Sequence, residues 1–218
     1  MTAAKKQPTD WQTLFENWHA AHESDDAAHD IHHFKRVWNV CRDIAATEDG
    51  ADMDVLLAGA YFHDVVNPPK DSPLRSKASR LAGDKAVEIL TEMGFPHEKL
   101  EAVRHAIAAH SFSANIPAET LEAKILQDAD RMEALGAIGQ ARCFYVSGRL
   151  NRPLFDPQDP LAEHREADDG TWGDDHFFCK LLKIPGKMQT ERGRQIAARR
   201  AQVLEDYLTE LKAEVLGA

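Results

Sequence analysis

A histidine and an aspartate stand side by side at His63 and Asp64, with apolar residues on both sides of the pair. The run from Val55 to Phe62 has the composition of a buried helix, and Asp52 is placed to cap its start. Burying an unpaired charge is far more unfavourable than burying an amide, so both side chains need a partner. A divalent metal satisfies both, because it accepts imidazole nitrogen and carboxylate oxygen as ligands. For an isolated pair, a core histidine bonded to a carbonyl beside a salt-bridged aspartate is the alternative.

Further histidines and aspartates along the chain favour the metal. His29 and His33 are four residues apart, so a continuous helix places them on one face. Asp128 and Asp130 follow later, two positions apart in an Asp-Ala-Asp-Arg run. Taken with the His-Asp pair, this gives His33, His63, Asp64 and one late aspartate, which are two imidazoles and two carboxylates from three helices. This donor set suits Mn²⁺, Mg²⁺, Fe or Ni better than a structural zinc site.

The elements that must position these side chains are predicted to be helices. Apolar residues recur at helical spacing over segments 10–18, 31–46, 76–93, 97–110, 121–146, 175–182 and 190–216, besides the helix that leads into the His-Asp pair and ends near Asn67. Residues 147–175 are rich in glycine, proline and acids, and they predict a long irregular excursion, a kind of loop that is usually functional or mobile. No segment shows convincing strand alternation, so the sequence predicts an all-α fold.

Bulk composition narrows the possible partners and location. A chain of 218 residues with 43% hydrophobic and 28% charged residues is typical of one globular domain. The net charge of −10 argues against nonspecific binding to nucleic acid or to an anionic membrane. The three cysteines form neither a disulfide framework nor a zinc pattern, and no apolar run approaches the roughly 20 residues that span a bilayer. With no secretory signal at the start, we expect a cytoplasmic protein.

Several short motifs follow one another in a fixed order. They are His33 with Arg36-Val37, His63-Asp64, His110-Ser111, Asp128-Ala129-Asp130-Arg131 and His176-Phe177-Phe178-Cys179-Lys180-Leu181. This series resembles the H…HD…D pattern of the HD-domain superfamily of metal-dependent phosphohydrolases, and more closely its small stand-alone bacterial members. The resemblance covers roughly residues 10 to 212. It implies a single-domain HD-type helical bundle over 10–212, with an HD core at about 29–135 and a C-terminal helical part at about 175–216.

The resemblance also implies one divalent metal in a helix-lined cleft, with Mn²⁺ expected first and Mg²⁺, Ni²⁺, Co²⁺ or Fe²⁺ as alternatives. The ligands that it implies are His33, His63, Asp64 and Asp130. Asp128 and Asp130 lie about 200° apart around a helix, so one metal cannot easily use both, and each shares a face with apolar residues. Asp130 matches the motif better, and Asp128 and His29 are expected to lie behind the ligands.

For activity, the resemblance implies hydrolysis of a phosphoester or phosphoanhydride bond of a (deoxy)nucleotide or a similar small phosphorylated metabolite. Some superfamily members carry a Glu-Asp pair soon after the His-Asp, where this chain has Val66-Asn67-Pro68-Pro69. Asp64, the metal or another polar group must then activate the water, and His110, at a helix end, is a candidate contact to the substrate or the leaving group. Lys70, Lys77 and Arg80 cluster just after the metal motif, and they and Lys180 are candidate phosphate contacts, the alternative being a solvated or packing role.

Two other functions are compatible with the same motifs. Some HD-fold proteins are dinuclear iron oxygenases that add histidine ligands, and His105 and His110 are the candidates here, although five-residue spacing does not put both on one helix face. A non-catalytic metal-binding HD domain is the other, and the intact ligand set argues against it.

Overall fold

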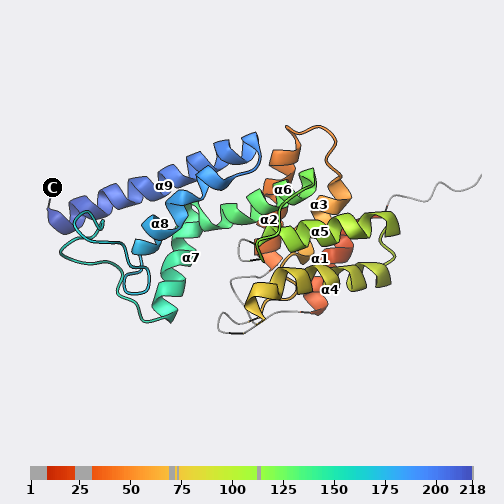
Figure 1. The fold of residues 1–218 in the computed structure, drawn as a ribbon, viewed down its shortest axis with the longest axis horizontal. Helices are drawn as coiled ribbons and strands as arrows, with labels where there is room; N and C mark the ends of the chain where they lie inside the picture. The colour runs from red at the N-terminus through yellow and green to blue at the C-terminus, as the bar shows by residue number, and fades with distance from the viewer. Residues whose placement is uncertain (1–8, 23–30, 69–71, 73, 112–113, 218) are drawn as a thin grey trace, which may run out of the picture.

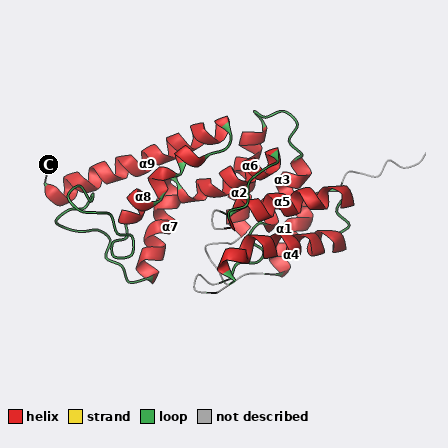
Figure 2. Cartoon of the chain, in the orientation of Figure 1, coloured by secondary structure: helices red, strands yellow, loops and turns green. Residues whose placement is uncertain are grey.

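Helices make up all of the regular structure that we describe. The structure is a computed structural model that describes residues 9–22, 31–68, 72, 74–111 and 114–217. Within these ranges there is no strand, as Figure 2 shows. The α-helices are α1 (Trp11–Ala21), α2 (Ile31–Ala45), α3 (Met53–Phe62), α4 (Ala78–Glu92), α5 (Leu100–His110), α6 (Leu121–Arg131), α7 (Gly136–Arg149), α8 (Asp175–Cys179) and α9 (Glu191–Leu216). The predicted all-α fold is confirmed.

Helix α3 forms the centre of the fold, because every residue from Val55 to Phe62 is buried. Its start is fixed by Asp52, whose side chain accepts the backbone N–H groups of Asp54 and Val55 at 3.0 and 3.3 Å. A cap of this kind contributes about 1 kcal/mol to stability. The helix ends with His63 as its C-cap. The His-Asp pair therefore sits where the chain leaves the core.

Helices α2, α5 and α6 pack around α3. Helix α2 buries one face, as its helical periodicity predicted, through Phe34, Val37, Trp38, Cys41 and Ile44. Figure 1 shows α1 to α6 gathered at one end of the molecule, with α7, α8 and the long α9 extending to the other. The segments that carry His33, His63, Asp64 and Asp130 thus lie in one bundle.

The predicted helix at 121–146 is wrong at its centre, where the chain turns. After α6, a 3₁₀ turn covers Met132–Ala134, and α7 begins at Gly136. Gly136 has φ +67°, a conformation that glycine adopts readily, and a Cβ there would lie 3.4 Å from the Arg200 side chain. The Arg200 guanidinium in turn donates to the Met132 carbonyl at 2.8 Å. This turn carries Glu133, which is buried.

The excursion after α7 is fastened to the C-terminal helices. Arg165 donates to both carboxylate oxygens of Asp175, at 2.5 and 2.8 Å, and Asp175 is fully buried. The backbone N–H of Asp168 donates to the same carboxylate at 2.6 Å. Helix α9 starts at the cap Thr190 and ends at Gly217, which has a left-handed φ of 72°. Across the described residues, none of the helices is both long and apolar enough to cross a membrane.

Candidate metal centre

Two imidazole rings meet at the heart of the bundle. His33 on α2 and His63 at the end of α3 are 1% and 0% exposed, and their Nε2 atoms lie 3.1 Å apart. The opposite ring nitrogens are engaged: Nδ1 of His33 donates to Glu133 at 3.2 Å, and Nδ1 of His63 donates to the Ala60 carbonyl at 3.0 Å. Both acceptors lack a proton to give, so in the neutral rings the two Nε2 atoms present lone pairs toward each other.

Two carboxylates face the same pair of nitrogens. Asp130 Oδ1 lies 3.6 Å from His63 Nε2 and 3.8 Å from His33 Nε2. Asp64 Oδ2 lies 3.8 Å from His63 Nε2. Ligand atoms of His33, His63 and Asp64 all lie within 4.8 Å of one another. Neighbouring ligands of one divalent ion, each about 2.0–2.2 Å from it, lie at separations like these. The donor set and its geometry therefore fit a metal.

The electrostatics of the cluster favour a positive charge between the rings. Burial by itself lowers the pKa of His63, but the charges of Asp64 and Asp130 outweigh it and raise this pKa to about 9. Burial raises the pKa of Asp130, and His63 and His110 outweigh burial and lower it. Burial lowers the pKa of His33 and so favours its neutral, metal-binding form. A divalent cation and a proton compete for such a cluster.

A third imidazole borders the cluster. His110, the last residue of α5, is 6% exposed, and its Nδ1 donates to the Ile107 carbonyl at 2.6 Å. Its Nε2 lies 3.6 Å from Asp64 Oδ1. His105 lies elsewhere, because its Nε2 accepts the backbone N–H of Glu119 at 3.2 Å. The structure thus brings His110 to the site and leaves His105 outside it.

Asp128 and Asp130 point to different partners. Asp128 is fully buried and accepts the backbone N–H groups of Gln189 and Thr190 and the Thr190 hydroxyl, the nearest oxygen lying 2.8 Å from each of these donors. Those bonds tie α6 to the start of α9. Of the two aspartates, Asp130 is the one whose carboxylate faces His33 and His63.

The residues of the candidate metal centre lie in the part of the chain that matches a known protein family. Residues 30–135 match the family described as the HD domain. The chain carries an HD domain. YpgQ of Bacillus subtilis is 29% identical over 198 residues, covering 88% of this chain and 87% of YpgQ. The resemblance drawn from the sequence motifs is confirmed.

Solved structures of similar proteins share the fold along almost the whole chain. The Lin1889 protein from Listeria innocua superposes with a TM-score of 0.70 at 29% identity, covering 94% of each chain. YpgQ of Bacillus subtilis in complex with ADP gives a TM-score of 0.71 at 27% identity, covering 93% of this chain and 97% of YpgQ. An HD-superfamily hydrolase from Bacillus thuringiensis gives 0.68 at 28% identity, covering 93% of each chain.

The candidate phosphate contacts are spread over the HD domain and beyond it. Lys77 and Arg80 are exposed, and neither side chain forms a hydrogen bond or ion pair with another described residue, although the backbone N–H of Lys77 donates to the Leu74 carbonyl. Their segment nevertheless lies beside the site, because the Ser79 hydroxyl donates to the Ala108 carbonyl near the end of α5, at 2.9 Å. Lys180 is exposed at the end of α8, in the C-terminal half. His29 and Lys70 lie outside the described residues.

Sequence reasoning missed one residue that contacts the metal cluster. Glu133 is 3% exposed, and its Oε2 accepts from His33 Nδ1 and from Nε and Nη2 of Arg36, the last two at 2.8 and 2.7 Å. Arg142 Nη1 lies 3.7 Å from the same oxygen. The available signal was a charged residue between the apolar Met132 and Leu135, three positions after Asp130.

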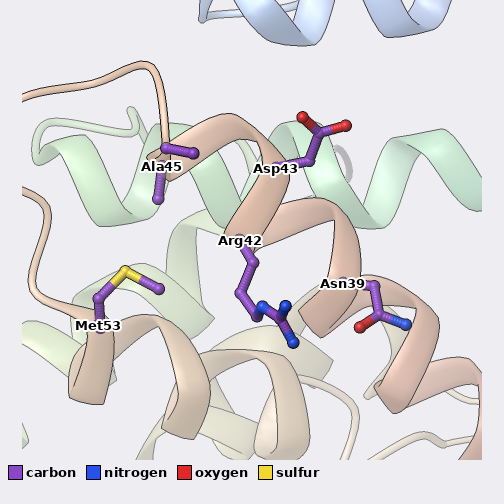
Figure 3. Close-up of a pocket in the computed structure, with 6 residues that line it drawn as sticks. Asn39, Arg42, Asp43, Ala45 and Met53 are labelled. Atoms are coloured by element: carbon purple, nitrogen blue, oxygen red, sulfur yellow. The ribbon is translucent and has the colours of Figure 1, made fainter.

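A surface hollow of about 450 Å³ lies away from this cluster. It is lined by Asn39, Arg42, Asp43, Ala45, Ala46 and Met53, at the C-terminal half of α2 and the start of α3. In Figure 3, Arg42 extends from α2 into the space between Met53 and Asn39, whereas Asp43 points to the opposite side. Asp43 is paired with Arg192 of α9 at 2.9 Å. The hollow contains none of the residues of the metal cluster, so we assign it no part in the chemistry.

Proposed function

We propose that this protein is a metal-dependent phosphohydrolase that cleaves a phosphate or pyrophosphate linkage of a small phosphorylated metabolite, with a nucleotide as the expected substrate. One observation carries the proposal: two buried Nε2 atoms 3.1 Å apart face the carboxylate of Asp130, with Asp64 beside them. With both Nδ1 atoms engaged elsewhere, a cation shared by the two Nε2 atoms and the carboxylates accounts for this arrangement, and a proton on His63, whose pKa the two aspartates raise, competes for the same place.

In the proposed site, His33, His63, Asp64 and Asp130 hold a divalent ion, with Mn²⁺ expected first. When bound, such an ion lowers the pKa of a water and polarises a phosphoryl oxygen. Glu133 and the Ala60 carbonyl fix the two imidazoles in the tautomer that presents Nε2. This fixation lets the ligand geometry exist before the ion arrives, which reduces the reorganisation that binding requires.

Proton handling falls to Asp64 and His110. The Nε2 of His110 lies 3.6 Å from Asp64 Oδ1, and its Nδ1 proton is held by the Ile107 carbonyl. In the neutral ring, Nε2 can therefore accept a proton from the attacking water, and the imidazolium formed in this way can give that proton to the leaving group. Asp64 contributes one oxygen toward His63 and the other toward His110. No second carboxylate pair after the His-Asp is needed in this arrangement.

The substrate expectation rests on similarity and on nearby cations. YpgQ of Bacillus subtilis has been solved with ADP. Lys77 and Arg80 stand at the start of α4, beside the end of α5 that carries His110, and we propose that they contact the substrate phosphates. Lys180 is the more distant candidate. A cytoplasmic location, with no nucleic acid or membrane as partner, belongs to the same proposal.

The test is a hydrolysis screen of purified protein stripped of metal and then given Mn²⁺, Mg²⁺, Ni²⁺, Co²⁺ or Fe²⁺ in turn. A panel of nucleoside mono-, di- and triphosphates serves as substrate, and phosphate and pyrophosphate are quantified separately. We expect metal-dependent release with Mn²⁺ giving the highest rate. Absence of hydrolysis with every metal and substrate contradicts the proposal. Two irons per chain with oxygen consumption indicates the oxygenase instead, which the position of His105 disfavours.

A further inference from the structure

A second cluster of charged side chains, most of them arginines, adjoins the candidate metal centre, whose charged residues are aspartates. Its core is the buried Glu133 carboxylate, whose Oε2 contacts Arg36 Nη2 at 2.7 Å and lies 3.7 Å from Arg142 Nη1. Arg200 is close enough that the charges of Glu133 and Arg36 both act on its pKa, which burial lowers. We call Arg36, Arg142 and Arg200, with Glu133, the arginine cluster.

The arginine cluster carries more positive charge than its own acid neutralises. Glu133 is the acid of this cluster, and its Oε2 accepts from His33 Nδ1 at 3.2 Å and from Arg36 Nε at 2.8 Å. One carboxylate thus faces three guanidinium groups, which are always charged. The whole chain carries a net charge of −10, so this local excess is not a general feature of its surface. Partly buried positive charge without a counterion is unfavourable, and an anion relieves it.

Donors in the arginine cluster are also left over. Arg142 Nη1 is buried and has no hydrogen-bond partner within the described part of the chain. Arg36 spends Nε and Nη2 on one oxygen of Glu133, and its side chain is 36% exposed. Guanidinium groups pair with phosphate through two parallel N–H bonds, and unused donors of this kind suit that geometry. By contrast, Arg149 on the same helix stacks over Tyr145 at 5.8 Å.

The imidazole ring of His33 connects the arginine cluster to the other proposed metal ligands. His33 presents Nε2 to His63 and Asp130, and its opposite nitrogen, Nδ1, contacts Glu133. Glu133 thus touches both the ligand His33 and the guanidinium groups.

We propose that Arg36 and Arg142, positioned by Glu133, bind a phosphate group of the substrate other than the one at the metal. The proposal rests on the proposed phosphohydrolase function, because it assigns a second contact to the same substrate. Arg36 and Arg142 bind the phosphate oxygens directly, and Glu133 acts as a positioning residue. Arg200 supplies charge to the cluster while its Nη1 holds the Met132 carbonyl.

The test measures binding of inorganic pyrophosphate by titration calorimetry to protein kept free of metal with chelator, so no turnover is involved. Arg142→Ala is compared with the matched control Arg149→Ala on the same helix and with Arg142→Lys. We expect Arg142→Ala to weaken pyrophosphate binding by about tenfold or more, the effect of losing a charge-assisted hydrogen bond. Arg142→Lys, which keeps the charge and loses the fork, is expected to lie between, and Arg149→Ala to match wild type.

Circular dichroism and thermal melting verify that each variant is folded, which is expected because Arg142 is partly exposed on a helix and alanine favours helix. Wild-type protein that binds no pyrophosphate, an Arg142→Ala affinity within twofold of wild type, or an equal loss in Arg149→Ala overturns the assignment. Hydrolysis with Mn²⁺ is measured separately: in Arg142→Ala we expect a raised KM with kcat little changed. Arg142-dependent pyrophosphate binding without any hydrolysis leaves the arginine cluster in place and defeats the phosphohydrolase proposal.

Discussion

Two regions of this molecule hold pairs of carboxylates partly or fully out of solvent, and the carboxylates have different partners in the two regions. In the metal centre, Asp64 and Asp130 face imidazole nitrogens that have no proton of their own to give in the neutral rings. In the C-terminal half, Asp175 receives two guanidinium bonds from Arg165 and a backbone N–H, while neither oxygen of its neighbour Asp174 has a hydrogen-bond partner among the described residues. Both regions are acidic, but Asp64 and Asp130 are 20% and 28% exposed, whereas Asp174 and Asp175 are fully buried.

The comparison separates a chemical site from a structural one. A carboxylate that is fully met by an arginine has nothing left to bind, so Asp175 fastens the excursion and does no more. At the candidate metal centre, two carboxylates and the Nε2 atoms of two histidines face one another, and a shared cation, either a metal ion or a proton on His63, satisfies them. The convergence of lone pairs on one point therefore marks a site, whereas burial of charge alone does not.

Among these variants, Asp64→Ala is expected to have the largest effect on bound metal and turnover. Loss of a partner behind a metal ligand lowers metal affinity or activity by about 10–100-fold, and loss of a carboxylate that faces the ion directly is expected to exceed that. We expect metal-dependent hydrolysis to fall below detection while the thermal melt stays close to that of wild type, because Asp64 lies at the edge of the core. Bound metal by elemental analysis and turnover are the measurements. Wild-type activity in this variant removes the site assignment.

The corresponding change in the other region is Asp175→Ala. Removing Asp175 leaves Arg165 with Asp156, 3.2 Å from its Nε, as its remaining ion-pair partner and leaves the backbone N–H of Asp168 without this acceptor, and we expect the free energy of unfolding to fall by about 3 kcal/mol. Metal content and kcat per folded molecule should not change, because Asp175 is absent from the metal cluster. Urea unfolding and elemental analysis on the same preparation test both statements. A loss of metal with unchanged stability would reverse the roles of the two regions.

Asp130→Asn and Asp128→Asn repeat the comparison within one helix. Asp130→Asn is expected to lose metal with little change in stability. Asp128→Asn is expected to keep metal and lose about 1–3 kcal/mol, because the carboxylate accepts bonds from Gln189 and Thr190 that an amide replaces only in part. Each variant serves as the control for the other in metal analysis and urea unfolding. The opposite ranking would mean that Asp128 faces the ion.

Local signals in the sequence predicted much of this arrangement. Helix α2 follows its apolar periodicity to within one residue, and Asp10, Asp52 and Thr190 stand at the helix starts with their side chains bonded to the expected backbone N–H groups. These features depend on neighbours in sequence. The break at Gly136 was missed, since the apolar spacing continues across it and the decisive contact is with Arg200 on a distant helix.

For the candidate site, too, the sequence predicted some residues and left others undecided. Motif order placed His33, His63, Asp64 and Asp130 together, and spacing alone left Asp128 and Asp130 undecided, because each shares a face with apolar residues. What separates them is Thr190, 62 positions from Asp128. Glu133 was out of reach for the same reason, since its partner His33 lies 100 positions away. Long-range pairing of polar groups leaves no periodic trace in a sequence.

The smallest effect concerns Asp174, a buried acid whose side-chain oxygens have no hydrogen-bond partner among the described residues. Burial, and then the charge of Asp175, raise its pKa to about 7, whereas in the unfolded chain the pKa is close to 3.9. Between these values the folded protein holds a proton that the unfolded chain has released, so the stability that Asp174 contributes is complete below pH 4 and is lost as pH rises toward 7. The steepest loss is about 1.4 kcal/mol per pH unit.

Asp174→Asn carries no such proton, so we expect this variant to be more stable than wild type at pH 8 and the difference to shrink toward pH 4. Urea unfolding at several pH values measures this difference, with Asp49→Asn, at an exposed position, as the control. A difference that does not vary with pH would show that Asp174 is ionised in the folded protein and that a partner satisfies it, which would bring it back to the class of Asp175.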